Sequence, residues 1–242
     1  MTDLLPAIVL FGDVVDSRLD PGTSDYLRGL RDELDAAYPA ERLAPTGFTQ
    51  GDEIQLLLAP GADPFRAVVR AALRAESRTL RWACAAGLVE PGTGPATERN
   101  GPAFHAARDL LERAKARREG LFAETGDPAA DALLADLGPL LPALLAELTA
   151  RQREVGRLLL VDELRRAQAA ERLGVSRATV SVIADRGRIR HVGRLASALA
   201  TIFRDGVAGD APATGEVPAT GDTPDAGKVP AGGTPNRAGS VV

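Results

Sequence analysis

The sequence contains few of the residues that support disulfide, thiol or zinc chemistry. Among its 242 residues are one cysteine, Cys84, and two histidines, His105 and His191. A single cysteine excludes an intramolecular disulfide and is typical of a reducing compartment. Together with two histidines it cannot supply the ligands of a zinc site. Aromatic residues make up only 4% of the chain, so the hydrophobic core must consist mainly of leucine, valine and alanine.

Long apolar runs are also scarce. No stretch approaches the roughly 20 apolar residues that a transmembrane helix needs, and no basic start followed by an apolar run resembles a signal peptide. We therefore expect a cytoplasmic protein with no membrane partner. Apolar residues nevertheless make up 45% of the chain, which is enough to build the core of one large domain or two modest ones.

Positive charge is concentrated in one segment. The whole chain carries a net charge of -4, but residues 1–150 carry -8, residues 151–204 carry +7 and residues 205–242 carry -3. A compact basic segment in an acidic protein is typical of a contact with nucleic acid. Arginine accounts for 27 of the 29 basic residues of the chain. The use of arginine rather than lysine in this segment is therefore a property of the whole chain and does not indicate nucleic-acid binding.

Two Gly-Asp pairs adjoin predicted strands. Residues 7–11 are apolar, which indicates a strand buried on both faces, and Asp13 follows this run. The second pair ends in Asp52 and joins the β-type runs 46–50 and 54–58, which predicts a hairpin. If the two acids lie on neighbouring strands, they can share Mg²⁺, a cation that binds one or two carboxylates together with water and phosphate.

Residues beside these acids extend the candidate site. Ser17 and Arg18 follow the first acid and can offer a hydroxyl, backbone N–H groups and a cation to a phosphate. Asp16 and Glu53 have two interpretations, because one can be a second metal ligand and the other a helix or turn cap. The alternative for the whole site is that Asp13 and Asp52 only form turns, for which aspartate is well suited.

Hydrophobic periodicity predicts the remaining elements of the first half. Helical spacing predicts helices over residues 25–38, from Asp63-Pro64 onward and from Pro102 onward, and the run 80–89 predicts a strand. The order of strand, helix, hairpin, helix, strand and helix predicts an α/β sandwich with a mixed or antiparallel sheet.

Arg108 falls on or beside the apolar face of the helix that begins near Pro102, four residues after Phe104. An unpaired guanidinium on such a face is unfavourable. The side chain therefore either extends past the edge of the sheet or points at an anion, which can be a nearby acid or a bound triphosphate.

A helix-turn-helix motif is predicted in the basic segment. A capping box at Thr149–Gln152 begins a helix that extends to about Val161, and a second helix over residues 166–173 is followed by a turn at Gly174. Ser176 caps the next helix, which would enter the major groove of DNA. The predicted DNA contacts are Ser176, Arg177, Ala178, Thr179, Ser181, Arg186, Arg188 and Arg190, with Arg194 as a further phosphate contact. The alternative is a helical dimerisation module with a solvated basic face.

The predicted domain organisation has four parts. Residues 1–122 form the α/β domain, residues 123–148 a helical connector and residues 149–205 an all-helical helix-turn-helix domain. Residues 206–242 repeat glycine and proline every six residues, a composition that predicts a disordered tail.

Four sequence blocks resemble the SatD family, whose name refers to secretion and acid tolerance. They read Phe-Gly-Asp-Val-Val-Asp-Ser-Arg, Gly-Asp-Glu-Ile-Gln, Leu-Arg-Trp-Ala-Cys-Ala-Ala-Gly and Gly-Pro-Ala-Phe-His-Ala-Ala-Arg, in this order. The resemblance spans about residues 7–190 and includes the helix-turn-helix, which itself resembles modules of bacterial transcription regulators.

The first half also resembles, more distantly, the palm fold of class III nucleotide cyclases and GGDEF proteins. This resemblance implies the ferredoxin-like or palm type of α/β sandwich. It also implies that Asp13 and Asp52 bind the metal, that Val14 offers it a backbone carbonyl and that Arg108 contacts phosphate. Phe48 and Phe104 stand where those cyclases carry a base-selecting lysine and a ribose-orienting asparagine. These departures favour nucleotide or metal binding over cyclase turnover.

Together these features predict a cytoplasmic DNA-binding regulator. In this hypothesis the palm-like domain senses a nucleotide through Mg²⁺ and controls the helix-turn-helix, which binds double-stranded DNA as a homodimer. The alternative is a Mg²⁺-dependent nucleotide cyclase or nucleotidyl-transfer enzyme with a helix-turn-helix appendage. A third possibility is a degenerate palm domain that serves only as a dimerisation scaffold.

Overall fold

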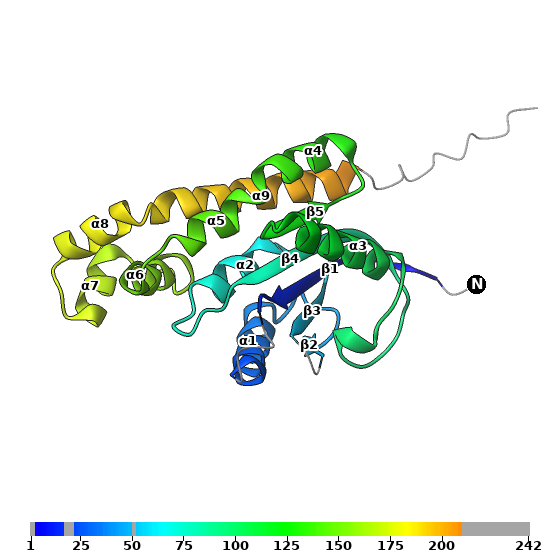
Figure 1. Cartoon of the computed structure of the whole chain (residues 1–242), viewed down its shortest axis with the longest axis horizontal. Helices are drawn as coiled ribbons and strands as arrows, with labels where there is room; N and C mark the ends of the chain where they lie inside the picture. The colour runs from blue at the N-terminus through cyan, green and yellow to red at the C-terminus, as the bar shows by residue number, and fades with distance from the viewer. Residues whose placement is uncertain (1–2, 17–21, 50–51, 210–242) are drawn as a thin grey trace, which may run out of the picture. The chain divides into compact units, whose positions relative to one another are not determined.

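A computed structural model describes residues 3–16, 22–49 and 52–209 of the chain (Figure 1). Its strands are β1 (Leu5–Val14), β2 (Gly47–Phe48), β3 (Glu53–Leu58), β4 (Leu80–Val89) and β5 (Leu121–Glu124). The helices that accompany the sheet are α1 (Thr23–Ala37), α2 (Phe65–Ala72), the short 3₁₀ helix η2 (Ala96–Glu98) and α3 (Pro102–Arg117). Six further helices are α4 (Pro128–Leu137), α5 (Leu140–Ala146), α6 (Ala150–Leu160), α7 (Arg166–Leu173), α8 (Arg177–Arg186) and α9 (Ile189–Gly209).

The five strands form one mixed sheet in the order β2-β3-β1-β4-β5. Strand β1 is central and antiparallel to both β3 and β4, β2 and β3 form the predicted hairpin, and β5 joins β4 in parallel. The first four strands with α1 and α2 have the β-α-β-β-α-β connection of ferredoxin-like sheets. The predicted α/β sandwich is thus confirmed, whereas β5, four residues long, was not predicted.

Alternate residues of β1 point into two separate hydrophobic cores. Ile8 and Leu10 belong to the larger core, which includes residues of α1 and α2, whereas Val9 and Phe11 pack with residues of α3 on the other face. The apolar run of β1 is therefore continuous because helices cover both faces of its strand.

Gly12 allows β1 to pack closely against β4. The register places Gly12 opposite Trp82, and a Cβ atom at this glycine would lie 2.7 Å from Cζ3 of the Trp82 ring. Any larger residue at position 12 would displace the indole, which is itself buried.

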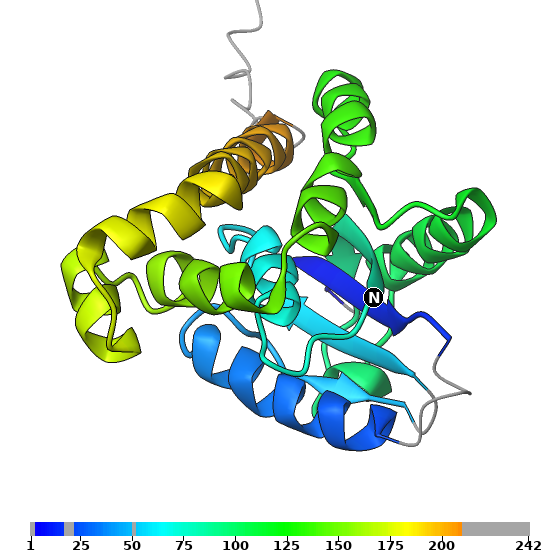
Figure 2. The ribbon, with the colours of Figure 1, turned by 60° about the vertical axis from the view of Figure 1, so that its left-hand side comes forward.

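The larger core continues from the sheet into the C-terminal helices without a break. It includes Leu134 of α4, Leu141 of α5, Val155 of α6 and Val180 of α8, and α9 packs along α4 and α5 (Figure 2). The predicted boundary between residues 122 and 123 falls inside β5, so this strand and the helices after it complete the sheet domain.

The helical part of the chain extends beyond residue 205, where the predicted helical domain ends. Helix α9 continues to Gly209, so the prediction of a tail from residue 206 was wrong for its first four positions. A Cβ atom at Gly206 would lie 2.5 Å from Oγ1 of Thr125, beside α4, which explains why the helix persists here: it packs on the end of β5. The rest of the predicted tail, residues 210–242, lies outside the described residues.

One described stretch, Pro128–Ala146, is long and apolar enough to cross a membrane, by length and composition alone. It comprises α4 and α5, which are separated at Gly138. Leu134, Leu141 and Leu145 of this stretch are buried in the larger core, whereas Leu133 and Leu140 are exposed.

We expect Gly12→Ala to lower the free energy of unfolding by about 1 to 3 kcal/mol, because the added methyl group overpacks the Trp82 ring. Urea unfolding of the variant and the wild type measures this difference. The matched control is Gly61→Ala, since a Cβ atom at Gly61 meets no atom within 4 Å. Equal unfolding midpoints for the two variants would contradict the packing argument.

Candidate functional site

Two carboxylates lie side by side at one edge of the face that α3 covers. The β1–β3 register places Asp13 directly opposite Glu53, so both side chains project to the same face of the sheet. Asp13 is only 7% exposed and Glu53 only 6% exposed. Burying ionised carboxylates is unfavourable unless each is paired, and α3 supplies both partners.

Arg108 and Lys115 of α3 each pair with one of these acids. They are seven residues apart, close to two helical turns, and so lie on the same side of the helix. Arg108 donates two hydrogen bonds to the Glu53 carboxylate, one of them 2.8 Å long from Nη2 to Oε1. Lys115 Nζ lies 3.3 Å from Asp13 Oδ1 and 3.2 Å from Glu112 Oε1.

Arg108 pairs with an acid of the protein, one of the two kinds of anion that the sequence left open. Its guanidinium also lies over the Phe11 ring, 4.6 Å from the centroid. The anion that it meets is therefore an acid of the protein itself, Glu53. A bidentate carboxylate contact stacked on an aromatic ring is an arrangement for which arginine is much better suited than lysine.

We call the pair of Asp13 and Glu53, with its partners Arg108 and Lys115, the acid edge. The pKa values of Asp13 and Lys115 are both shifted there. Burial raises the pKa of the Asp13 carboxyl, the Lys115 ammonium opposes this increase, and the charges of Asp52 and Glu53 add to it, so the pKa is raised. Burial lowers the pKa of Lys115, but Asp13 and Glu112 outweigh this effect and raise it. Perturbed groups of this kind are found at functional sites and in structural ion pairs alike.

The predicted metal ligands are only partly brought together. Asp52 precedes β3, and its backbone carbonyl accepts a hydrogen bond of 2.9 Å from the N–H of Val14. The cross-strand neighbour of Asp13 is thus Glu53 rather than Asp52. Asp16 is exposed in a left-handed conformation with φ of 57°.

Within residues 3–16, 22–49 and 52–209, no three His, Cys, Asp or Glu side chains form a metal-binding group. The donor chemistry of Asp13 suits a hard divalent cation, but such a cation would have to displace the Lys115 ammonium. The Mg²⁺ site at Asp13 and Asp52 therefore stays a prediction. The predicted phosphate ligands Ser17 and Arg18 lie outside the described residues.

A small cavity of about 220 Å³ adjoins the acid edge. Arg108, Gln55 and His105 line it together with residues of the loop before α3. Gln55 donates a hydrogen bond of 2.6 Å to Glu53, and the Phe104 ring packs 6.0 Å from that of Phe11. The aromatic residue at position 104 therefore forms part of the cavity wall.

Sequence analysis did not identify Lys115 as a member of this site. Two signals were present: Lys115 is one of only two lysines in the chain, and it lies two turns after Arg108 on the same helix. The pairing of Lys115 with Asp13 depends on where α3 packs on the sheet, and the local sequence does not specify this position.

The second candidate site is the helix-turn-helix, whose local geometry agrees with the predicted turn. Gly174 has φ of 64°, a conformation that favours glycine, and Ser176 Oγ accepts a hydrogen bond of 3.0 Å from the N–H of Thr179. Val180 and Ala170 are buried between the helices. The capping box at Thr149 and Gln152 is also present at the start of α6.

Most predicted DNA contacts are exposed. The exposed members are Ser176, Arg177, Ala178, Thr179, Arg186, Arg188 and Arg190. Ser181 is half-buried and accepts a hydrogen bond of 3.0 Å from Arg166. Val182 was not predicted, yet it is 50% exposed and lies one turn after Ala178 on α8.

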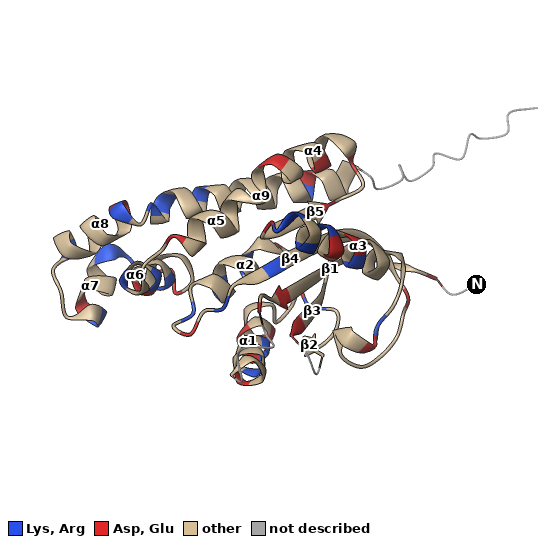
Figure 3. Ribbon diagram, viewed as in Figure 1, with Lys and Arg blue, Asp and Glu red and all other residues tan. Residues whose placement is uncertain are grey.

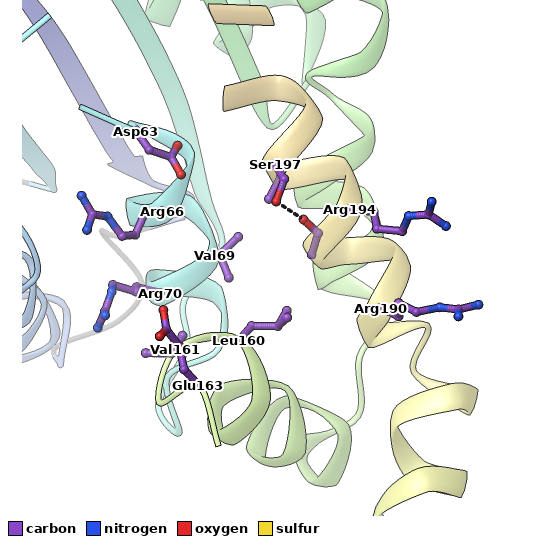
Figure 4. A pocket seen from close by; sticks show the side chains of 12 residues that line it. Asp63, Arg66, Val69, Arg70, Leu160, Val161, Glu163, Arg190, Arg194 and Ser197 are labelled. Carbon is purple, nitrogen blue, oxygen red and sulfur yellow. Dashed lines mark hydrogen bonds between the residues drawn. The ribbon is translucent and has the colours of Figure 1, made fainter. Parts of the chain in front are cut away.

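Arginines continue along α9. Figure 3 shows basic residues at intervals along α8 and α9. A pocket of about 740 Å³ lies between α2 and α9, and Val69 and Leu160 point into it, whereas Arg190 and Arg194 extend from α9 away from α2 (Figure 4). These two guanidiniums are therefore directed away from the sheet domain.

Comparisons with known proteins give little further information. No family model matches the chain, and no curated protein matches it, so the resemblance to the SatD family stays a prediction. Two solved structures of a bacterial light-regulated adenylyl cyclase align with TM-scores of 0.37, at 15% and 14% sequence identity. The alignments cover 50% and 51% of this chain, and 76% and 44% of those chains. At this TM-score the likeness carries no conclusion about fold or activity.

We expect Asp13→Asn to weaken the pH dependence of stability in weak acid. The raised pKa means that the folded protein binds this proton more tightly than the unfolded chain does. Ionisation therefore lowers the free energy of unfolding as the pH rises from about 3.8 through the raised pKa. Urea unfolding at several pH values measures the slope, and Asp109→Asn, an exposed residue of α3, is the control. A slope unchanged in Asp13→Asn would contradict the assignment.

Proposed function

We propose that the chain is a cytoplasmic DNA-binding regulator in which α8 enters the major groove of double-stranded DNA. The observation that carries this proposal is the combination of an α7-turn-α8 unit, capped at Ser176, with an exposed face on α8. The second helix of such a unit contacts base edges, while the first crosses the DNA backbone.

The exposed face of α8 has side chains suited to reading bases. Ala178, Thr179 and Val182 present methyl groups, which match the methyl group of thymine in the major groove. Arg177, in the first turn, can donate to guanine or to a backbone phosphate. A mixed apolar and cationic face of this kind supports readout of a defined sequence.

The arginines after α8 supply the contacts to the DNA backbone. Among the described carboxylates, none forms an ion pair with Arg186, Arg188 or Arg190, whereas Arg166 pairs with Asp185 at 3.2 Å. Guanidiniums that remain free of protein partners can neutralise phosphates and release counterions. We further propose that two copies bind as a homodimer, because helix-turn-helix proteins commonly occupy two half-sites.

We expect replacement of Arg177 and Arg186 by alanine to weaken binding to duplex DNA at least tenfold. Loss of each phosphate contact reduces the slope of log K against log salt by about 0.9. Fluorescence anisotropy with a labelled random-sequence duplex, followed by selection of preferred sites, measures both quantities.

The matched control for this experiment is Arg28→Ala, which removes an exposed arginine on α1. Wild-type affinity and salt slope are expected for it. If the double variant binds DNA as tightly as the wild type, α8 is not the DNA-contacting element.

A second candidate function is binding of a nucleotide with Mg²⁺ at the acid edge, and this includes the alternative of a nucleotidyl-transfer enzyme. The observation that favours it is the buried Asp13 and Glu53 pair beside a cavity lined by Arg108. When Mg²⁺ and a triphosphate bind, the displaced Lys115 ammonium would be free to pair with a phosphate. The ion pair between Lys115 and Asp13 would then be replaced by contacts of both residues with Mg²⁺ and phosphate.

We expect Mg²⁺ to increase the melting-temperature shift that a nucleoside triphosphate causes in EDTA, and Asp13→Asn to abolish this Mg²⁺-dependent increase, because binding stabilises the folded state. Thermal unfolding with each of the four triphosphates measures it, with Asp109→Asn as control. Pyrophosphate release that requires Asp13 would establish the enzymatic alternative. No shift with any nucleotide would favour a scaffold domain.

A further inference from the structure

Glu33 of α1 is surrounded by three arginines from other parts of the chain. Its carboxylate lies 3.7 Å from Arg70 of α2, 2.5 Å from Arg74, which follows α2, and 2.9 Å from Arg157 of α6. The side chain of Glu33 is only 14% exposed. One carboxylate neutralises one guanidinium, so this half-buried cluster has two positive charges in excess.

The protein holds Arg74 in a space made for its guanidinium. Arg74 Nη1 donates a hydrogen bond of 3.1 Å to the carbonyl of Gly29, and a Cβ atom at Gly29 would lie 2.7 Å from Nη2. The Nε atoms of Arg70 and Arg74 are buried and have no hydrogen-bond partner in the described chain. Donors of this kind are normally satisfied by protein, water or a ligand.

A pocket of about 450 Å³ adjoins this cluster, between the end of α2 and the start of α6. Four arginines and one carboxylate residue line it: Arg74, Arg151, Arg153, Arg157 and Glu154. Arg151 pairs with Glu154 at 2.6 Å. Arg153 instead donates to the carbonyl of Leu148 at 2.7 Å, an acceptor that does not neutralise its charge.

The remaining walls of the pocket suit the body of an organic ligand. Leu73 and Ala75 provide an apolar surface, and Ala150, the first residue of α6, places the beginning of an 11-residue helix in the wall. The N–H groups of a helix N-terminus add partial positive charge and donors for an anion. Ligand pockets commonly have volumes of about 300 to 1,000 Å³.

We propose that this pocket binds a phosphorylated small molecule of about the size of a nucleotide, with its phosphates against the arginines and its apolar part on Leu73 and Ala75. The surplus of guanidinium charge selects a polyanion, and arginine matches phosphate through two parallel hydrogen bonds. This site is distinct from the acid edge, because it contains four arginines and needs no metal.

Its place in the fold gives the site a regulatory consequence. The pocket joins α2, which packs on the sheet, to α6, which leads into the helix-turn-helix. A ligand held by both helices would fix their relative position, so its binding would be coupled to any function of α8 that depends on that position.

The experiment is isothermal titration calorimetry of the full chain in EDTA, with ATP, pyrophosphate and adenosine as probes. EDTA removes the divalent cation on which the acid edge would depend. ATP and pyrophosphate are expected to bind and adenosine is not. Arg151→Gln with Arg153→Gln is expected to weaken binding at least tenfold, and Asp109→Asn, an exposed residue of α3, is expected to have no effect.

The matched control is Arg172→Gln, an exposed arginine of α7, and equal thermal unfolding of all variants verifies that they fold. Absence of binding by both phosphates would overturn the proposal, as would equal weakening in Arg172→Gln. If only duplex DNA binds and Arg153→Gln reduces its affinity, the arginines are DNA contacts and the small-molecule proposal is wrong.

Discussion

Burial of β1 on both faces is the constraint on which the rest of the structure depends. A central strand covered by helices on each side has no solvated face for a charge, yet Asp13 is part of it. The protein accommodates this carboxylate at the end of the strand, beside Glu53, and places the cations of α3 against both acids. Close packing on the other face of β1 explains why residue 12 is a glycine, because the Trp82 ring leaves no room for a side chain there.

The arginine-rich composition has different consequences in different parts of the molecule. On α8 and α9 the arginines are exposed, and those at positions 190 and 194 extend away from α2, which suits contact with a polyanion. Around Glu33 they are half-buried and outnumber the carboxylates, which is costly unless an anion joins them. At the acid edge, Arg108 neutralises an acid of the protein itself. Exposure and local charge balance therefore distinguish three roles for one residue type.

Local signals of the sequence were sufficient for the helix starts and the turn between α6 and α8. Gly174, the cap at Ser176 and the capping box at Thr149 act within a few residues of chain, and each is found where it was predicted. Strand β5 was missed because four residues provide too short a pattern. The extension of α9 was also missed, since it depends on packing of Gly206 against Thr125, some eighty residues earlier.

The sequence alone determined the order of strands and helices as far as α3, the presence of acids near the end of β1 and the capped turn between α7 and α8, because periodicity and capping are local properties. Only the tertiary structure decided that Glu53 rather than Asp52 lies opposite Asp13, that Lys115 pairs with that acid and that three arginines meet at Glu33. Strand register and helix docking set these neighbours. Both are established by burial of apolar faces between segments far apart in the chain, and a shift of one residue in register would have placed different side chains together.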